Sequence, residues 1–143
     1  MKTYLVAYVS TLIAFLVIDF IWLSTMASRL YRPAIGDMLA DSFRLAPAIA
    51  FYLIYAAGLT FLAVRPALVS GQWNTALLYG AVVGFMAYAT YDLTNQATLK
   101  NWSTTLTLAD LAWGTFVSAS ATTIAYIVTM RLAPPIGNAA GMP

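Results

Sequence analysis

One stretch of this sequence concentrates side chains that can bind or react. From Tyr91 to Trp102 it reads YDLTNQATLKNW, which supplies a carboxylate, a phenol, hydroxyls, carboxamides and an indole. The segment before it, residues 76–90, is mostly apolar. Polar groups of this density at the end of an apolar segment favour a functional site there.

Two further carboxylates share a pattern of their own. Asp19 is followed by Trp22, and Asp110 by Trp113, so the residues of each pair are three positions apart. Residues at this spacing are neighbours on the surface of a helix. Carboxylates beside aromatic rings suit a cationic or amphipathic ligand, through charge pairing and cation–π contact.

The candidate ligand-binding residues are these carboxylates, nearby aromatic residues, the hydroxyl and amide that follow Asp92, and one arginine of the first loop. They are Asp19, Trp22, Arg32, Tyr88, Tyr91, Asp92, Thr94, Asn95, Trp102, Asp110 and Trp113. The sequence singles out no catalytic residue among them, so it leaves open whether the protein is an enzyme.

Composition excludes several classes of chemistry. The chain has no histidine and no cysteine, and its five acidic residues are all aspartates. A thiolate nucleophile, a haem ligand and the usual transition-metal sites are therefore absent, and we predict no metal and no cofactor. The net charge of +2 comes from scattered basic residues that form no patch for nucleic acid.

The same composition predicts an integral membrane protein. Of the 143 residues, 62% are hydrophobic and only 8% are charged, whereas soluble domains have about 25% charged residues. Apolar segments long enough to cross a ~30 Å hydrocarbon core predict an all-α bundle of four transmembrane helices, at about residues 4–25, 45–64, 75–97 and 106–130. We expect one domain over residues 1–130, a flexible tail over 131–143, and both termini on the same side.

Counting from the expected helix ends places three carboxylates at one level. Asp19, Asp92 and Asp110 all lie within roughly 6–9 Å of the membrane face that carries the first and third loops, at 1.5 Å per residue. A carboxylate at this depth costs about 2–3 kcal/mol and should face inward towards a donor. The candidate donors are Arg32, Lys100, Asn95, Tyr91 and the tryptophan N–H groups.

Purely structural roles explain part of this pattern. Asp110 near a helix start can stabilise that helix end, and Trp22, Trp102 and Trp113 near one interface fit an aromatic belt. Asp92 and Asn95 fit this reading least, because an anion near a helix C-terminus is disfavoured by the helix dipole.

The connections and packing faces are also visible. We expect a polar loop from Ala27 to about Arg44, and an end to the second helix at Arg65-Pro66, since proline lacks the N–H that a helix interior needs. Gly80 and Gly84 form a G-x-x-x-G pattern, and small residues recur every fourth position from Gly114 to Thr122. Such faces permit close helix contact, which we expect inside one chain, with a homodimer as the alternative.

The motif YDLTNxATLxxW over residues 91–102 resembles that of a bacterial family of small predicted membrane proteins, catalogued as a domain of unknown function. Asp19-x-x-Trp22, the segment Tyr31 to Gly36 and Asp110-x-x-Trp113-Gly114 add to the resemblance, which extends to about Met130. The resemblance implies a four-helix, multi-pass protein of the bacterial inner membrane. It implies no reaction and no catalytic residue.

Three functions remain open from the sequence. The first is binding or transport of a small cationic or amphipathic ligand at the three aspartates. The second is a membrane-embedded enzyme or enzyme subunit that acts on lipid, with oxygen ligands for a divalent cation. The third is a structural or regulatory subunit of a membrane complex, in which Arg32 and Lys100 would neutralise the carboxylates.

Overall fold

A computed structural model of the protein describes residues 1–135, all of whose regular structure is helical. Its helices are α1 (Lys2–Met26), α2 (Arg32–Ile35), α3 (Leu45–Leu59), α4 (Arg65–Ser70), α5 (Trp73–Thr98) and α6 (Thr104–Leu132). Shorter turns, η1 (Ala27–Tyr31), η2 (Gly36–Met38) and η3 (Thr60–Val64), join some of them into longer rods. Four rods are long and apolar enough to cross a membrane: Lys2–Met38, Leu45–Ser70, Trp73–Thr98 and Thr104–Leu132.

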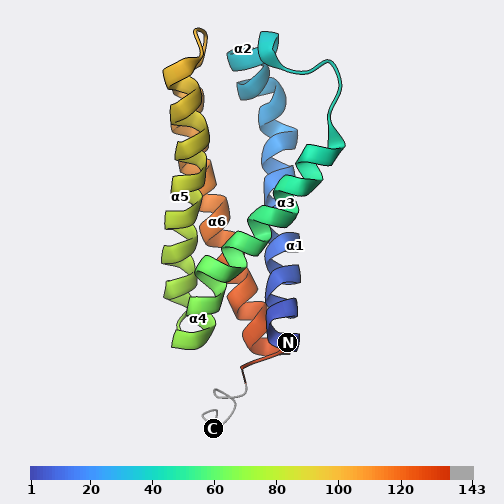
Figure 1. The fold of residues 1–143 in the computed structure, drawn as a ribbon, viewed down its shortest axis with the longest axis vertical. Helices are drawn as coiled ribbons and strands as arrows, with labels where there is room; N and C mark the ends of the chain where they lie inside the picture. Colours follow the sequence, from blue (N-terminus) through green and yellow to red (C-terminus); the bar gives the residue numbers. More distant parts are fainter. Residues whose placement is uncertain (136–143) are drawn as a thin grey trace.

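The predicted four-helix architecture is thus confirmed. The start of α1 and the end of α6 lie at the same end of the bundle (Figure 1). Helix α6 extends to Leu132, into the expected tail, whose residues 136–143 lie outside the described part of the chain. Helix α6 is also the central element, packing against α1 and α5 and contacting η3.

The chain stays helical through both of its Arg-Pro pairs, Arg32-Pro33 and Arg65-Pro66. Before each proline the helix widens into a π-turn, in which the Arg32 N–H bonds to the Ala27 carbonyl and the Arg65 N–H bonds to the Thr60 carbonyl. A widened turn accommodates the missing N–H and the bulk of the proline ring. The expectations of a polar loop from Ala27 and of a helix end at Arg65-Pro66 were therefore wrong.

The small residues of α5 and α6 allow their backbones to meet. A Cβ atom on Gly84 would come within 2.6 Å of Ser118 Oγ, and one on Gly80 within 2.9 Å of the Ser118 carbonyl oxygen. The Thr122 hydroxyl donates a hydrogen bond of 2.8 Å to the Ala76 carbonyl on the facing helix. The G-x-x-x-G face is thus occupied within one chain, as expected, so a dimer would need another surface.

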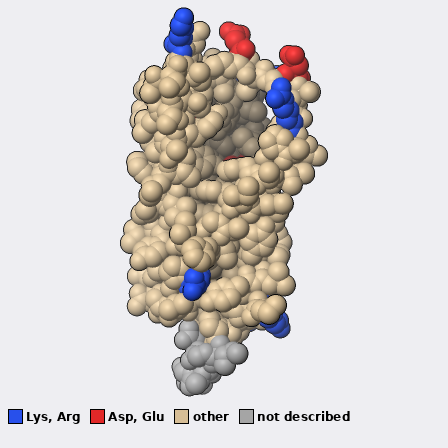
Figure 2. Space-filling model, viewed as in Figure 1, with Lys and Arg blue, Asp and Glu red and all other residues tan. Residues whose placement is uncertain are grey.

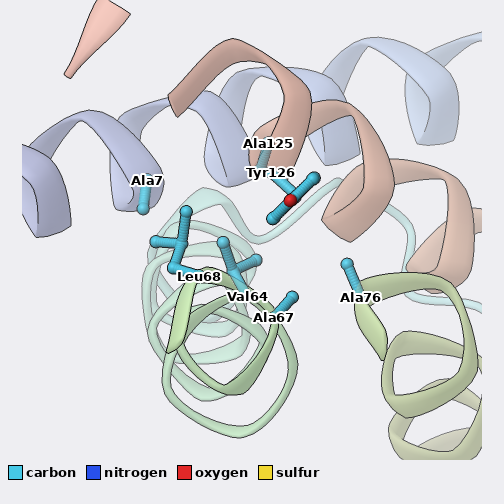
Figure 3. Close-up of a cluster of buried hydrophobic side chains, with 7 residues drawn as sticks. All are labelled: Ala7, Val64, Ala67, Leu68, Ala76, Ala125 and Tyr126. Atoms are coloured by element: carbon cyan, nitrogen blue, oxygen red, sulfur yellow. The ribbon is translucent and has the colours of Figure 1, made fainter. Parts of the chain in front are cut away.

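The end of the bundle near the start of α1 is closed by small apolar side chains. Ala7, Ala76 and Ala125 meet Val64, Ala67, Leu68 and Tyr126 there, and five of these residues show no exposed surface (Figure 3). A second buried cluster, formed by Phe15, Leu59, Val117 and Ala121, lies further along the bundle. The buried carboxylates of α5 and α6 lie towards the opposite end.

That opposite end is less completely covered, because α3 crosses the bundle obliquely (Figure 1). Its upper end leans away from α5 towards the connection to α2. In the same orientation, the surface has a hollow above α3, between α5 and the α1–α2 rod, with an acidic side chain visible inside it (Figure 2). Most other charged side chains in this view lie around the same end of the molecule.

Candidate functional site

The fold brings the carboxylates of α5 and α6 to the same depth. Asp92 lies six residues before the end of α5, and Asp110 lies six residues after the start of α6. Both are therefore ~9 Å from the ends of their helices. Asp92, Asp110 and Asp19 are exposed by only 0%, 4% and 5%, and the electrostatic interaction of Asp110 with each of the other two reflects their proximity.

Asp19 on α1 is held by two neutral donors from other helices. The Tyr52 hydroxyl of α3 donates to Asp19 Oδ2 over 2.7 Å, and the Trp113 indole N–H of α6 donates to Oδ1 over 3.1 Å. Both carboxylate oxygens therefore have a partner. Phe15 lies one turn below Asp19 and packs its ring edge against Tyr52 and Tyr55, which fixes the position of the Tyr52 phenol.

Asp110 is held by a relay that begins on α1. The Trp22 indole N–H donates to the Tyr31 oxygen over 3.1 Å, and the Tyr31 hydroxyl donates to Asp110 Oδ1 over 2.6 Å. Tyr31 reaches this position because the rod of α1 continues through η1 instead of leaving the bundle as a loop.

The two Asp-x-x-Trp pairs are thus crossed between helices, although the sequence suggested contacts within each helix. Helices α1 and α6 run in opposite directions (Figure 1), so Trp22 lies above Asp19 while Trp113 lies below Asp110. The two indoles stack on each other, with ring centroids 4.3 Å apart and planes inclined by 8°. Trp113 of α6 therefore binds the carboxylate of α1, and Trp22 of α1 acts through Tyr31 on the carboxylate of α6.

Asp92 differs from the other two carboxylates. It has no exposed surface, and neither Oδ1 nor Oδ2 has a hydrogen-bond partner. A buried polar group without a partner costs free energy, and a buried charge without one costs far more. A proton, a cation or a hydrogen-bond donor beside Asp92 would therefore stabilise it in this position.

Tyr88 lies one turn before Asp92 on α5 and is half-buried. Its ring occupies the space that a side chain at Gly114 would need, since a Cβ there would overlap the Tyr88 Cγ and Cδ2 atoms. The absence of a side chain at Gly114 thus lets an aromatic ring enter the carboxylate layer.

Other predicted site residues lie at the rim. Tyr91 is 57% exposed and meets the edge of Trp102, whose indole N–H donates to the Thr107 hydroxyl. The Thr94 hydroxyl donates to the Thr90 and Tyr91 carbonyls of its own helix. The half-buried Asn95 accepts a hydrogen bond from the Leu99 N–H through its backbone carbonyl.

The expected basic partners of the carboxylates lie elsewhere. The donors to Asp19 and Asp110 are phenols and an indole, all neutral, while Arg32 and Lys100 line a separate pocket at the outer end. Among residues 1–135, Arg32 and Lys100 thus form no salt bridges with the buried aspartates, although the hypothesis of a structural or regulatory subunit required them. In the same residues no group of three acidic side chains is compact enough to hold a metal ion, so the metal-dependent enzyme hypothesis gains no support.

The comparison with protein families agrees with this architecture. The family model described as "Predicted membrane protein (DUF2177)" matches residues 4–127, which include the three buried aspartates and both stacked tryptophans. The chain belongs to this family. No curated protein and no solved structure matches it significantly.

Two residues of this DUF2177 site were missing from the prediction. Tyr31 falls within the polar loop expected from Ala27 to about Arg44, and Tyr52 lies in the expected second helix but is not among the candidate ligand-binding residues. The signal for Tyr52 is its spacing with Tyr55, which places two phenols on one face of an apolar helix. Tyr31 could have been found only if the helix had been predicted to continue past Ala27.

Replacement of Tyr31 by phenylalanine tests the relay of the DUF2177 chain. The variant leaves Asp110 without its donor and Trp22 without its acceptor. We expect a loss of about 1–3 kcal/mol, since a buried group is left unsatisfied, measured as a lower unfolding temperature in detergent. Tyr8→Phe is the control, because the Tyr8 hydroxyl makes an exposed 3.3 Å bond to a backbone carbonyl; equal effects of the two variants would contradict the relay.

Proposed function

We propose that this protein binds a small cationic or amphipathic ligand at its three buried aspartates, and that it carries this ligand within or across the membrane. The observation that carries the proposal is Asp92, a fully buried carboxylate with two unpartnered oxygens. A ligand cation supplies the partner that the described chain lacks.

The residues around the three aspartates support a ligand that combines charge with apolar surface. Tyr88 lies one helical turn before Asp92, and the stacked rings of Trp22 and Trp113 lie beside the partners of Asp110 and Asp19. Such rings attract cations by a further 0.5–2 kcal/mol or so in partly desolvated sites. Asp19 and Asp110 keep their oxygens engaged with neutral donors. They therefore add negative potential without competing as ion pairs.

A proton and a ligand cation would compete for Asp92. Protonation removes the negative charge that attracts the ligand, so the affinity should fall as the pH is lowered. Exchange of one proton for one cation on a buried carboxylate is a mechanism for coupled transport. A soluble-phase binding protein would not need its carboxylate buried among apolar helices.

The location follows from the same features. Four rods can span a membrane, and the lipid bilayer is therefore the protein's immediate environment. We infer from the resemblance to bacterial inner-membrane proteins that this multi-pass chain lies in the bacterial cytoplasmic membrane.

The test is a thermal-shift titration of the full-length protein in a neutral detergent. The probes are alkyltrimethylammonium ions of increasing chain length, with alkyl sulfates of the same lengths as anionic controls. We expect the ammonium series to raise the unfolding temperature of the wild type at pH 8 and to do so less at pH 5. The Asp92→Asn variant should lose at least 10-fold in affinity, because it lacks the anion but keeps the shape.

Asp41→Asn is the matched control, since Asp41 is an exposed acid at the same end of the molecule. It should bind the ammonium series like the wild type. Equal stabilisation by ammonium and sulfate compounds, or equal affinity of Asp92→Asn and wild type, would overturn the proposal and direct attention to a protein partner.

A further inference from the structure

A second pocket lies outside the carboxylate layer, at the outer end of the bundle. It has a volume of about 290 Å³ and is enclosed by residues 32–38 of the α2–η2 segment and residues 99–101 of the loop between α5 and α6. These two segments come from opposite halves of the chain. The pocket exists because the α1 rod continues to Met38 and brings α2 across the outer end of the bundle (Figure 1).

Three charged side chains converge on this pocket. Arg32 and Lys100 contribute positive charges from the two walls, and Asp37 contributes one negative charge. All three are exposed, and within residues 1–135 none of them makes an ion pair or a side-chain hydrogen bond. Their charges are therefore available to a ligand.

The rest of the lining is apolar or amide. Ile35, Met38 and Leu99 provide apolar surface, and Asn101 provides a carboxamide. Lys100 and Asn101 lie two and three residues past Thr98, the last residue of α5. Because α5 is longer than a ~30 Å hydrocarbon core requires, we expect the pocket to lie in the headgroup layer. A molecule bound there can keep its polar part among the charges and its apolar part in the membrane.

We propose that this pocket binds a phosphoethanolamine headgroup, with the phosphate between Arg32 and Lys100 and the primary ammonium on Asp37. A guanidinium presents a planar fork of donors that matches two phosphate oxygens, and an ammonium adds a compact second charge. This site is separate from Asp92 and does not rest on the function proposed above.

The negative charge of Asp37 selects among phosphate-containing headgroups. A purely anionic headgroup such as phosphoglycerol gains from Arg32 and Lys100, but its phosphate is repelled by Asp37, and its hydroxyls offer Asp37 a neutral hydrogen bond in place of an ion pair. A choline headgroup carries a positive charge but no N–H to donate. Phosphoethanolamine suits all three side chains, because its phosphate pairs with Arg32 and Lys100 and its primary ammonium donates to Asp37.

The test measures lipid binding to the full-length protein by native mass spectrometry from detergent. The probes are phosphatidylethanolamine, phosphatidylglycerol and phosphatidylcholine with identical acyl chains, each added at increasing concentration. We expect the ethanolamine lipid to bind at least 5-fold more tightly than the other two. The double variant Arg32→Gln/Lys100→Gln should lose at least 10-fold for the ethanolamine lipid.

Two single variants separate this pocket from general surface charge. Arg44→Gln removes a positive charge that does not line the pocket and should bind all three lipids like the wild type. Asp37→Asn should remove the preference for ethanolamine over glycerol while leaving phosphate binding. These positions are exposed, so the unfolding temperature of each variant should stay within a few degrees of wild type. Measuring that temperature verifies that the variants are folded.

Several results would overturn the proposal: equal or tighter binding of phosphatidylglycerol to the wild type, unchanged binding in the double variant, or an equal loss in Arg44→Gln. Soluble glycerophosphoethanolamine, added as a competitor, identifies the source of the headgroup. If the soluble compound competes at micromolar concentration, the ligand of the pocket is a free phosphate ester. If it does not compete at millimolar concentration, the ligand is the membrane lipid. Asp92→Asn should leave all these affinities unchanged, so this proposal and the cation proposal can fail independently.

Discussion

Replacement of Gly84 by valine should destabilise the protein by about 3 kcal/mol or more, at the upper end of what overpacking costs. A Cβ at this position would overlap the Gly114 carbonyl oxygen and would lie 2.6 Å from Ser118 Oγ and 2.7 Å from Ser118 Cβ. One of these contacts is with backbone, which cannot rotate away. Helices α5 and α6 would have to separate, and Asp92 and Asp110 would separate with them.

Gly58→Val is the matched control for this prediction. A Cβ at Gly58 has no atom within 4 Å, so both variants share the cost of a β-branched residue in a helix and only Gly84→Val adds the clash. The measurement is the midpoint of unfolding in detergent for both variants against wild type. Similar midpoints for the two would mean that α5 and α6 do not pack through Gly84.

Replacement of Asp92 by asparagine should stabilise the ligand-free protein at neutral pH. The wild type holds a buried carboxylate with no partner for either oxygen, and an unsatisfied buried group costs about 1–3 kcal/mol, more when it is charged. Asparagine removes the charge while keeping nearly the same volume. We therefore expect a gain of about 1–3 kcal/mol, seen as a higher unfolding temperature without added ligand.

The pH dependence makes this prediction specific. Lowering the pH supplies a proton to the wild-type carboxylate, so the advantage of Asp92→Asn should shrink between pH 8 and pH 5. Asp19→Asn should behave oppositely and lose stability, because Asp19 accepts hydrogen bonds from Tyr52 and Trp113 and an amide nitrogen cannot accept one of them. A loss of stability in Asp92→Asn at every pH would show that the carboxylate has a structural partner.

The depth of the site could be predicted from the sequence because it depends on one constant. A helix rises 1.5 Å per residue, so counting from the end of each apolar segment was enough to place Asp92 and Asp110 at one level. The count for Asp19 assumed a first helix that ends near residue 25, whereas its rod continues to Met38. The same count could not identify the donors. Whether Trp113 serves Asp110 or Asp19 depends on which helices are neighbours and on their directions, and only the assembled bundle determines both.

The Arg-Pro pairs show a second limit of sequence reasoning. Proline normally ends or kinks a helix, and the expected end at Arg65 followed from that rule. The loop from Ala27 was expected because polar and charged residues replace the apolar run there. The π-turns η1 and η3 resolve the conflict locally, but a π-turn has no reliable signature in a single sequence. Missing η1 had the larger consequence, because Tyr31 and the outer pocket both depend on the continuation of the first rod.

The oblique course of α3 determines from which phase a ligand would arrive. The hollow above α3 opens sideways, between α5 and the α1–α2 rod (Figure 2), so the ligand proposed above would reach it from the side of the bundle, which is where acyl chains would lie in a bilayer. A hydrophobic cation that enters there is already enriched by partitioning into the bilayer, so its local concentration can exceed the aqueous one by orders of magnitude. Measured affinities should therefore scale with the partition coefficient of each compound, and a modest intrinsic affinity would be enough for high occupancy.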